Sequence, residues 1–146
     1  MKYEESFEKE FISRTLKLLR QYETSCGITK YEDTLVLNLC VGLLIIPKQA
    51  YDDQFQSLQH TFVDKKEWSI DIRMISVGEK DVYNIIRHIR NSISHKRFEL
   101  ISENSYEITH IIVKDKRHDN SRGFSFNAEF PLTILKDFVI KVAEYA

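Results

Sequence analysis

The hydrophobic pattern of the N-terminal half predicts helices. Residues 3–25 carry apolar side chains three or four positions apart, as an amphipathic helix does, and Gly27 follows as a stop signal. Residues 29–32 have the pattern of a capping box for a second helix. Residues 35–46 are apolar on almost every side, so we expect a buried central helix that Pro47 ends or kinks.

The middle of the chain is less regular before a strong helical period returns. Residues 48–60 are polar with a narrow apolar face, which predicts another helix. Residues 61–78 contain Trp68 and a short alternation compatible with extended chain, and we interpret them as a loop. From Glu79 onward the helical period is clear. Its apolar stripe, which should face the core, consists of Val82, Ile85, Ile86, Ile89 and Ile93.

The C-terminal part changes to a two-residue period. Residues 106–113 are rich in β-branched side chains and residues 124–130 alternate cleanly, which predicts two strands of a hairpin with a long polar loop. Pro131 fits the first turn of a last helix. We therefore expect one domain over residues 1–146. It would be a mainly α bundle of about five helices with a β-hairpin before the last helix.

Composition narrows the functional classes. The 146 residues include 21 Lys and Arg against 22 Asp and Glu, so bulk coating of nucleic acid is disfavoured but a local basic site is not. Two cysteines exclude a disulfide scaffold, and we expect neither thiol to be catalytic. The longest apolar stretch is too short to span a bilayer, and residues 1–10 lack the apolar segment of an export signal. We expect a cytoplasmic protein that does not contact membranes.

The densest positive patch lies on the helix that begins near Glu79. Between residues 84 and 97 there are four cationic side chains, two histidines and no acid. The cations are Arg87, Arg90, Lys96 and Arg97. Arg and Lys in this density suit phosphate groups, because the guanidinium fork makes paired hydrogen bonds to phosphate oxygens. A plainer interpretation is that these cations only complement the C-terminal end of the helix.

Within the patch, Arg90, Asn91 and His95 form an Arg-Asn-x3-His motif. Metal-independent RNA cleavage needs a group that exchanges protons near neutral pH and a fixed cation at the developing negative charge. Histidine supplies the first and arginine the second. Asn91, four residues before His95 on the same helical face, would orient the imidazole.

Arg90 and His95 are five residues apart, or about 140° around an ideal helix. They therefore do not converge on one straight helix. Either the helix ends near His95, or the site combines residues from two protomers.

The motif and the N-terminal half resemble a known family. Residues 11–22, FISRTLKLLRQY, and 34–47, TLVLNLCVGLLIIP, are similar to a small bacterial, often plasmid-encoded, subfamily of the HEPN superfamily. The resemblance implies a dimerising helical bundle and a metal-independent endoribonuclease, in a toxin–antitoxin or anti-phage setting. It assigns the catalytic site to Arg90, Asn91 and His95. HEPN toxins often carry Tyr two residues after the histidine, where this chain has Arg97, so silencing by nucleotide transfer onto that Tyr is not expected.

The expected partners are RNA, a second copy of the chain and an antitoxin protein, with no cofactor and no metal. Arg87, Lys96 and Arg97 are the RNA-binding candidates, and solvated surface remains an equal interpretation for the last two. We expect His88 at the surface. The aromatic residues Trp68, Tyr106, Phe124 and Phe126 are expected in the core rather than stacked on bases. Two alternatives stay open: a module that binds RNA or a nucleotide without cleavage, and a helical adaptor for proteins.

Overall fold

The computed structural model describes residues 7–24, 32–48, 52, 58, 61–102, 108–118 and 121–145. The predicted capping box at 29–32 and most of the predicted helix at 48–60 lie outside the described residues. Statements about the fold below concern the described residues.

The two N-terminal helices are confirmed. α1 spans Phe7–Glu23 and α2 spans Glu32–Cys40. α2 runs directly into the π-helical turn η1, Val41–Ile45, and Pro47 follows two residues after its end. Leu43 and Leu44 are fully buried, as expected for an apolar central helix. Cys40 is also fully buried, and burial raises the pKa of its thiol to about 12.

The prediction of a loop at residues 61–78 was wrong. This stretch forms the short helix α4, Lys65–Trp68, the 3-10 turn η3, Ile72–Met74, and the strand β1, Ile75–Val77. Asp64 caps α4 by accepting hydrogen bonds from the backbone of Lys66 and Glu67, and Asp71 caps η3 in the same way. These side chains provide the local order that the hydrophobic period does not show.

The helix that carries the basic patch is α5, Val82–Ser94. Asp81 caps its N-terminus, where the carboxylate accepts from the backbone N–H of Asn84. Gly78, with φ +115°, makes the tight turn before it, and a Cβ there would lie 2.6 Å from the Phe126 ring. The predicted apolar stripe is buried at Val82, Ile85, Ile86 and Ile89.

The predicted hairpin exists, but the fold class predicted from it was wrong. β3, Ile108–Asp115, pairs antiparallel with β4, Phe126–Pro131. Two further strands extend this pair, because β1 pairs with β4 and β2, Glu99–Ser102, pairs with β3. The result is a four-stranded antiparallel sheet in the order β1-β4-β3-β2. The chain is therefore an α+β protein rather than a helical bundle with one hairpin.

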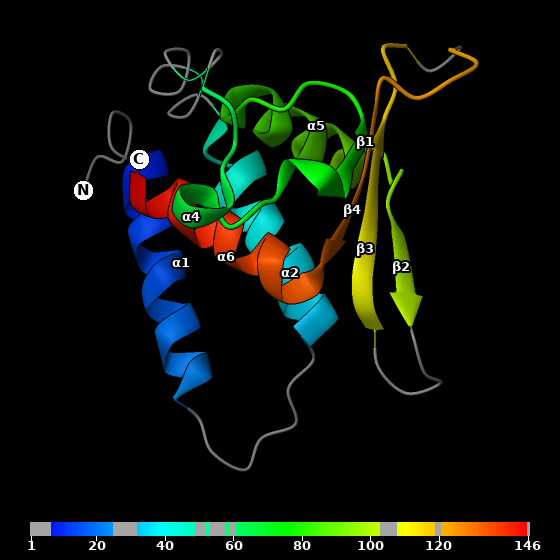
Figure 1. Ribbon diagram of the computed structural model, residues 1–146. Coiled ribbons are helices and arrows are strands. Elements are labelled where there is room, and N and C mark those ends of the chain that lie inside the picture. The colour runs from blue at the N-terminus through cyan, green and yellow to red at the C-terminus, as the bar shows by residue number, and fades with distance from the viewer. Residues whose placement is uncertain are drawn as a thin grey trace.

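The helices cover one face of this sheet. Figure 1 shows the sheet along one side of the molecule, with α5, α2 and α6, Leu132–Tyr145, on its inner side. Pro131, expected in the first turn of this last helix, ends β4 directly before it. The inner face contributes buried residues of alternating strand positions: Ile111, Val113, Phe126, Ala128 and Phe130. The described helices include none that combines the length and apolar character needed to cross a membrane.

Candidate functional site

Burial of Arg90 is the first unexpected feature of α5. Arg90 lies four residues after Ile86, so both side chains are on the same side of the helix. The arginine is only 5% exposed. A buried guanidinium is costly unless it is paired, so its partners define the site.

The partner of Arg90 is Asp52. Nη2 of Arg90 donates to Oδ1 of Asp52 at 3.2 Å, and Nζ of Lys48 reaches the other carboxylate oxygen at 2.6 Å. Partial burial favours a raised pKa for Asp52, but the hydrogen bond from Lys48 and the charge of Arg90 outweigh it and lower this pKa. Nη1 of Arg90 is buried and has no hydrogen-bond partner among the described residues.

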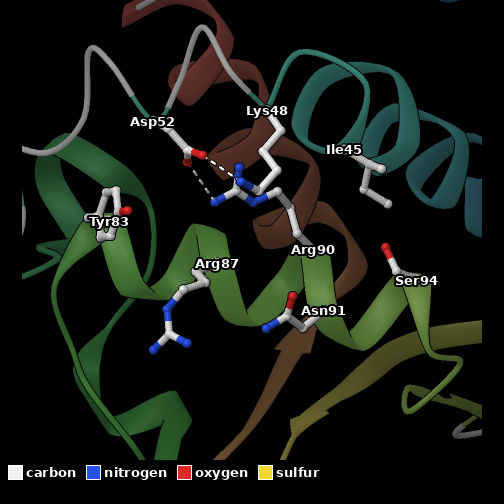
Figure 2. A pocket seen from close by; sticks show the side chains of 8 residues that line it. All are labelled: Ile45, Lys48, Asp52, Tyr83, Arg87, Arg90, Asn91 and Ser94. Atoms are coloured by element: carbon white, nitrogen blue, oxygen red, sulfur yellow. Dashed lines mark hydrogen bonds and ion pairs between the residues drawn. The ribbon is translucent and has the colours of Figure 1, made fainter. Parts of the chain in front are cut away.

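Arg90 reaches into a hollow of about 250 Å³. Figure 2 shows Arg90 and Lys48 converging on Asp52, with Arg87 and Asn91 below them along α5. The hollow is lined by Ile45, Lys48, Asp52, Tyr83, Arg87, Arg90, Asn91 and Ser94. Three cations and one carboxylate leave a net positive charge, which suits an anionic group such as a phosphate.

His95 lies at the end of the helix. α5 ends at Ser94, and His95 is the C-cap residue with φ −101° and ψ 8°. Lys96 follows in the left-handed conformation with φ 53°, and the backbone N–H of Arg97 donates to the carbonyl of Ser92 at 2.8 Å. This hydrogen bond and the left-handed conformation of Lys96 are features of a Schellman motif, which turns the chain sharply toward β2. α5 therefore ends at His95, as the first of the two expected arrangements requires, and the same helix end leaves the imidazole exposed to a second protomer.

His95 is exposed, and the Asn91 side chain makes no hydrogen bond to its imidazole. The only bond between them is the helical one from the His95 N–H to the Asn91 carbonyl at 2.9 Å. Within the described ranges, His95 makes no side-chain hydrogen bond. The side-chain amide of Asn91 instead donates to Oδ2 of Asp115 at 3.0 Å. Any influence of Asn91 on His95 therefore passes through the end of α5 and Asp115.

Asp115 is the centre of a buried polar network that the sequence interpretation missed. Its carboxylate is 1% exposed, and it accepts from Asn91, from Nη1 of Arg97 at 3.1 Å and from Nδ1 of His88 at 2.7 Å. The backbone N–H of Lys116 also donates to it at 2.8 Å. These donors satisfy a carboxylate that would otherwise be too costly to bury.

His88 is buried, contrary to the prediction that it lies at the surface. It is 1% exposed and stacks on Phe126 with ring centroids 4.5 Å apart. Its two ring nitrogens face two carboxylates, Asp115 at Nδ1 and Glu79 at Nε2. His88 therefore links Asp115 at the end of β3 to Glu79 in the segment before α5.

Glu79 is the half-exposed member of this network and contacts His88 from the solvent side. Burial tends to raise the pKa of its carboxyl group, but the hydrogen bond with His88 and the nearby Arg87 charge lower it overall. Nη2 of Arg87 lies 3.9 Å from the Glu79 carboxylate, and Nε of Arg87 donates to Asn84. Glu79 is therefore held as a carboxylate on the same face as the basic patch.

The three RNA-binding candidates have different surroundings. Arg87 is half-exposed and lines the hollow around Arg90. Lys96 is exposed at the turn after His95. Arg97 points back to Asp115, so part of its guanidinium serves the buried network. The structure brings Arg87, Arg90 and Asn91 to one hollow and leaves Lys96 on the other side of His95.

Spacing alone could have revealed three of these features. His88 is three residues after Ile85 and four before Ser92, both buried, and Arg90 is four after Ile86. Asp115 has the same parity in β3 as Ile111 and Val113, which predicts an inward side chain. Asp52 could not be found in this way, because only the tertiary fold brings it to Arg90.

No group of three or more His, Cys, Asp or Glu side chains in the described part of the chain is arranged to hold a metal ion. The side chains of the site are instead mainly donors: guanidinium, ammonium, amide and imidazole groups. This donor set binds oxyanions rather than cations.

Fold and site together define an α+β protein with a cationic, phosphate-suited hollow along one helix, which an exposed histidine follows in the chain. A scan against family models places the chain in a specific group. The model of the HEPN pEK499 p136 family matches residues 1–146, and the chain belongs to this family of HEPN-domain proteins. Searches of curated proteins and of solved structures gave no match.

Proposed function

We propose that this HEPN-domain protein is a metal-independent endoribonuclease whose site is formed by Arg90 and His95. The observation that carries the proposal is the state of Arg90. It is a buried guanidinium with one nitrogen that lacks a partner among the described residues, inside a hollow that also holds Lys48 and Arg87. Such a group can take a phosphoryl oxygen as its second partner.

The reaction that fits these groups is attack of the ribose 2′-OH on the adjacent phosphorus. The P–O bond to the 5′-oxygen breaks, and the products are a 2′,3′-cyclic phosphate and a 5′-OH end. The 2′-OH loses a proton and the leaving 5′-oxygen gains one. His95 carries the proton transfer, and Arg90 holds the phosphoryl oxygen on which negative charge develops.

Asn91 has a positioning role in this proposal. Its amide connects the last turns of α5 to the buried carboxylate of Asp115, which also holds Arg97 on the far side of the helix end. His95 lies between these two anchored residues in the chain. The network therefore supports the backbone on which the exposed imidazole is mounted.

The biological setting is part of the same proposal. A homodimer, control by an antitoxin protein, and action in a toxin–antitoxin or anti-phage system follow from the resemblance to HEPN ribonucleases. The basic character of the hollow supports RNA as the partner.

The test is the chemistry of the cut ends. Purified protein is incubated with total RNA in EDTA, and both new ends are mapped. We expect 2′,3′-cyclic phosphate and 5′-OH ends, and no cleavage of an oligonucleotide with 2′-deoxyribose at the mapped position. Ends bearing 3′-OH and 5′-phosphate would contradict transesterification. Binding without any cleavage would favour the RNA-binding module.

A further inference from the structure

A second basic hollow lies on the other side of His95. It has a volume of about 280 Å³, and its lining includes Lys96, Arg97, Lys114, Lys116 and Phe124. Ser94 lines the first hollow and Lys96 lines the second, so His95 stands between them in the chain. Consecutive Cα atoms are only about 3.8 Å apart, so the Cα atom of His95 lies at that distance from the Cα atom of one lining residue of each hollow.

Phe124 is the distinctive residue of this second hollow. It is 39% exposed, whereas Phe126, two residues later, is fully buried against His88. The ammonium groups of Lys114 and Lys116 each lie 5.2 Å from the centre of the Phe124 ring. An exposed ring beside two ammonium groups is not needed for the core, which the inward strand positions already fill.

The charges of the hollow are unevenly neutralised. Lys114 pairs with Glu99 at 2.9 Å, and Arg97 pairs with the buried Asp115. Across the described ranges, no carboxylate lies within ion-pair distance of Lys96 or Lys116. The second hollow is therefore lined by two ammonium groups without a carboxylate partner in the described ranges, those of Lys96 and Lys116, and by the partly exposed Phe124 ring.

We propose that this second hollow binds single-stranded RNA beside the scissile phosphate, with a base stacked on Phe124 and neighbouring phosphates on Lys96 and Lys116. A π-face combined with cations binds single strands, because every unpaired base offers a face for stacking and a duplex hides it. The inference rests on the proposed function in taking RNA as the polymer. It adds the substrate class, unpaired RNA, and the residues that select it.

The experiment is fluorescence anisotropy with a labelled 2′-O-methyl RNA pool, which a 2′-OH mechanism cannot cut. The variants are Phe124→Ala, the conservative Phe124→Tyr and Lys116→Gln. Phe62→Ala is the matched control, because Phe62 is 73% exposed and its neighbour in the fold is Asp81 at the opposite end of α5. Circular dichroism checks that each variant is folded.

We expect Phe124→Ala to weaken binding of single-stranded RNA roughly tenfold, the loss typical of one stacked base. Phe124→Tyr and Phe62→Ala should bind like the unmodified protein. Lys116→Gln should reduce the slope of log affinity against log salt by about 0.7, the contribution of one phosphate contact on a single strand, and Phe124→Ala should leave that slope unchanged.

The inference is overturned if Phe124→Ala binds as tightly as Phe62→Ala, or if a duplex competes as well as a single strand. Cleavage by the unmodified protein separates this result from failure of the proposed function. If the unmodified protein cleaves RNA but Phe124→Ala binds RNA as tightly as the unmodified protein does, only the inference about the second hollow is wrong. If Phe124→Ala binds RNA tenfold more weakly but the unmodified protein does not cleave RNA, the second hollow binds RNA and the proposed nuclease function is wrong.

Discussion

Three charged or ionisable residues in and around α5 are almost fully buried. Asp115 and His88 are each 1% exposed, and Arg90 is 5% exposed. Each buried charge has a partner of opposite charge or a row of donors, as burial requires. The residues nearest the proposed chemistry are therefore held by electrostatic contacts rather than by apolar packing alone.

Replacing Asp115 with Ala should strongly destabilise the fold. The change leaves the donors of His88, Asn91 and Arg97 without their shared acceptor. Breaking one partner of a buried ionic network typically costs about 3–5 kcal/mol. Urea unfolding measures this loss, with Glu129→Ala as the control, because Glu129 is exposed on β4. Equal midpoints for the two variants would contradict the structural role of Asp115.

Glu79 should make stability depend on pH. Its pKa is lowered in the folded state, because the hydrogen bond with His88 and the Arg87 charge outweigh partial burial. This contribution is present above the unfolded pKa of about 4.3 and is lost as the pH falls through the folded value. Glu79→Gln should cost at most about 1 kcal/mol near pH 7, since the side chain is half-exposed and screened.

Urea unfolding between pH 7 and pH 3 checks the effect of Glu79→Gln. The difference from the unmodified protein should shrink below about pH 4, where the carboxylate becomes protonated. Glu129→Gln, on the exposed side of β4, is the control. A difference that stays constant over the whole range would show that Glu79 acts through packing instead of charge.

At the scale of elements, the end of α5 decides where His95 lies. The Schellman motif places Lys96 in a left-handed conformation that glycine adopts more readily. Compared with Lys96→Ala, which keeps the strain, Lys96→Gly should raise the free energy of unfolding by about 1 kcal/mol. Thermal or urea unfolding of both variants tests this, and equal stability would argue against a strained turn.

Elements with a strong local pattern were predictable and the sheet edges were not. α1, the apolar helix of α2 and η1, α5 and the β3–β4 hairpin follow from the period of their apolar residues. β1 has only three residues and β2 only four, too few to show an alternation. Their pairing with β4 and β3 depends on contacts that the tertiary fold supplies, so a hairpin was expected where a four-stranded sheet exists.

The candidate site was predictable in part for the same reason. The motif gives Arg90, Asn91 and His95 as neighbours on one helix, and the helix end at Ser94 agrees with one of the two solutions expected from their spacing. The ion pair with Asp52 spans 38 positions of the chain. No local pattern reports such a contact, because it depends on how α5 packs on the segment after η1.

Across the whole molecule, Arg90 is itself buried at the wall of the first hollow, while His95 is exposed at the helix end. Two protomers could therefore share the chemistry, with Arg90 from one and His95 from the other. Mixing inactive Arg90→Ala and His95→Ala proteins after unfolding and refolding tests this arrangement. Half of the dimers would then be mixed, each with one complete site, so about a quarter of the original activity should return.

The mixing experiment can also show that two protomers do not share the site. If each protomer holds a complete site of its own, no mixed dimer contains an active site and no activity returns. Size-exclusion chromatography of the mixture verifies that dimers form, and a chain that elutes only as a monomer would contradict the shared site directly.

The roles of Arg90 and His95 are tested by the single-turnover cleavage rate of one mapped RNA in EDTA, measured for the unmodified protein, Arg90→Ala, His95→Ala and His118→Ala. His118 is an exposed histidine in the β3–β4 loop and serves as the matched control. We expect His118→Ala to cut at the original rate and both α5 variants to lose at least about a hundredfold, the usual contribution of proton transfer or charge stabilisation. Cleavage by His95→Ala at the original rate would contradict the proposal that His95 carries the proton transfer.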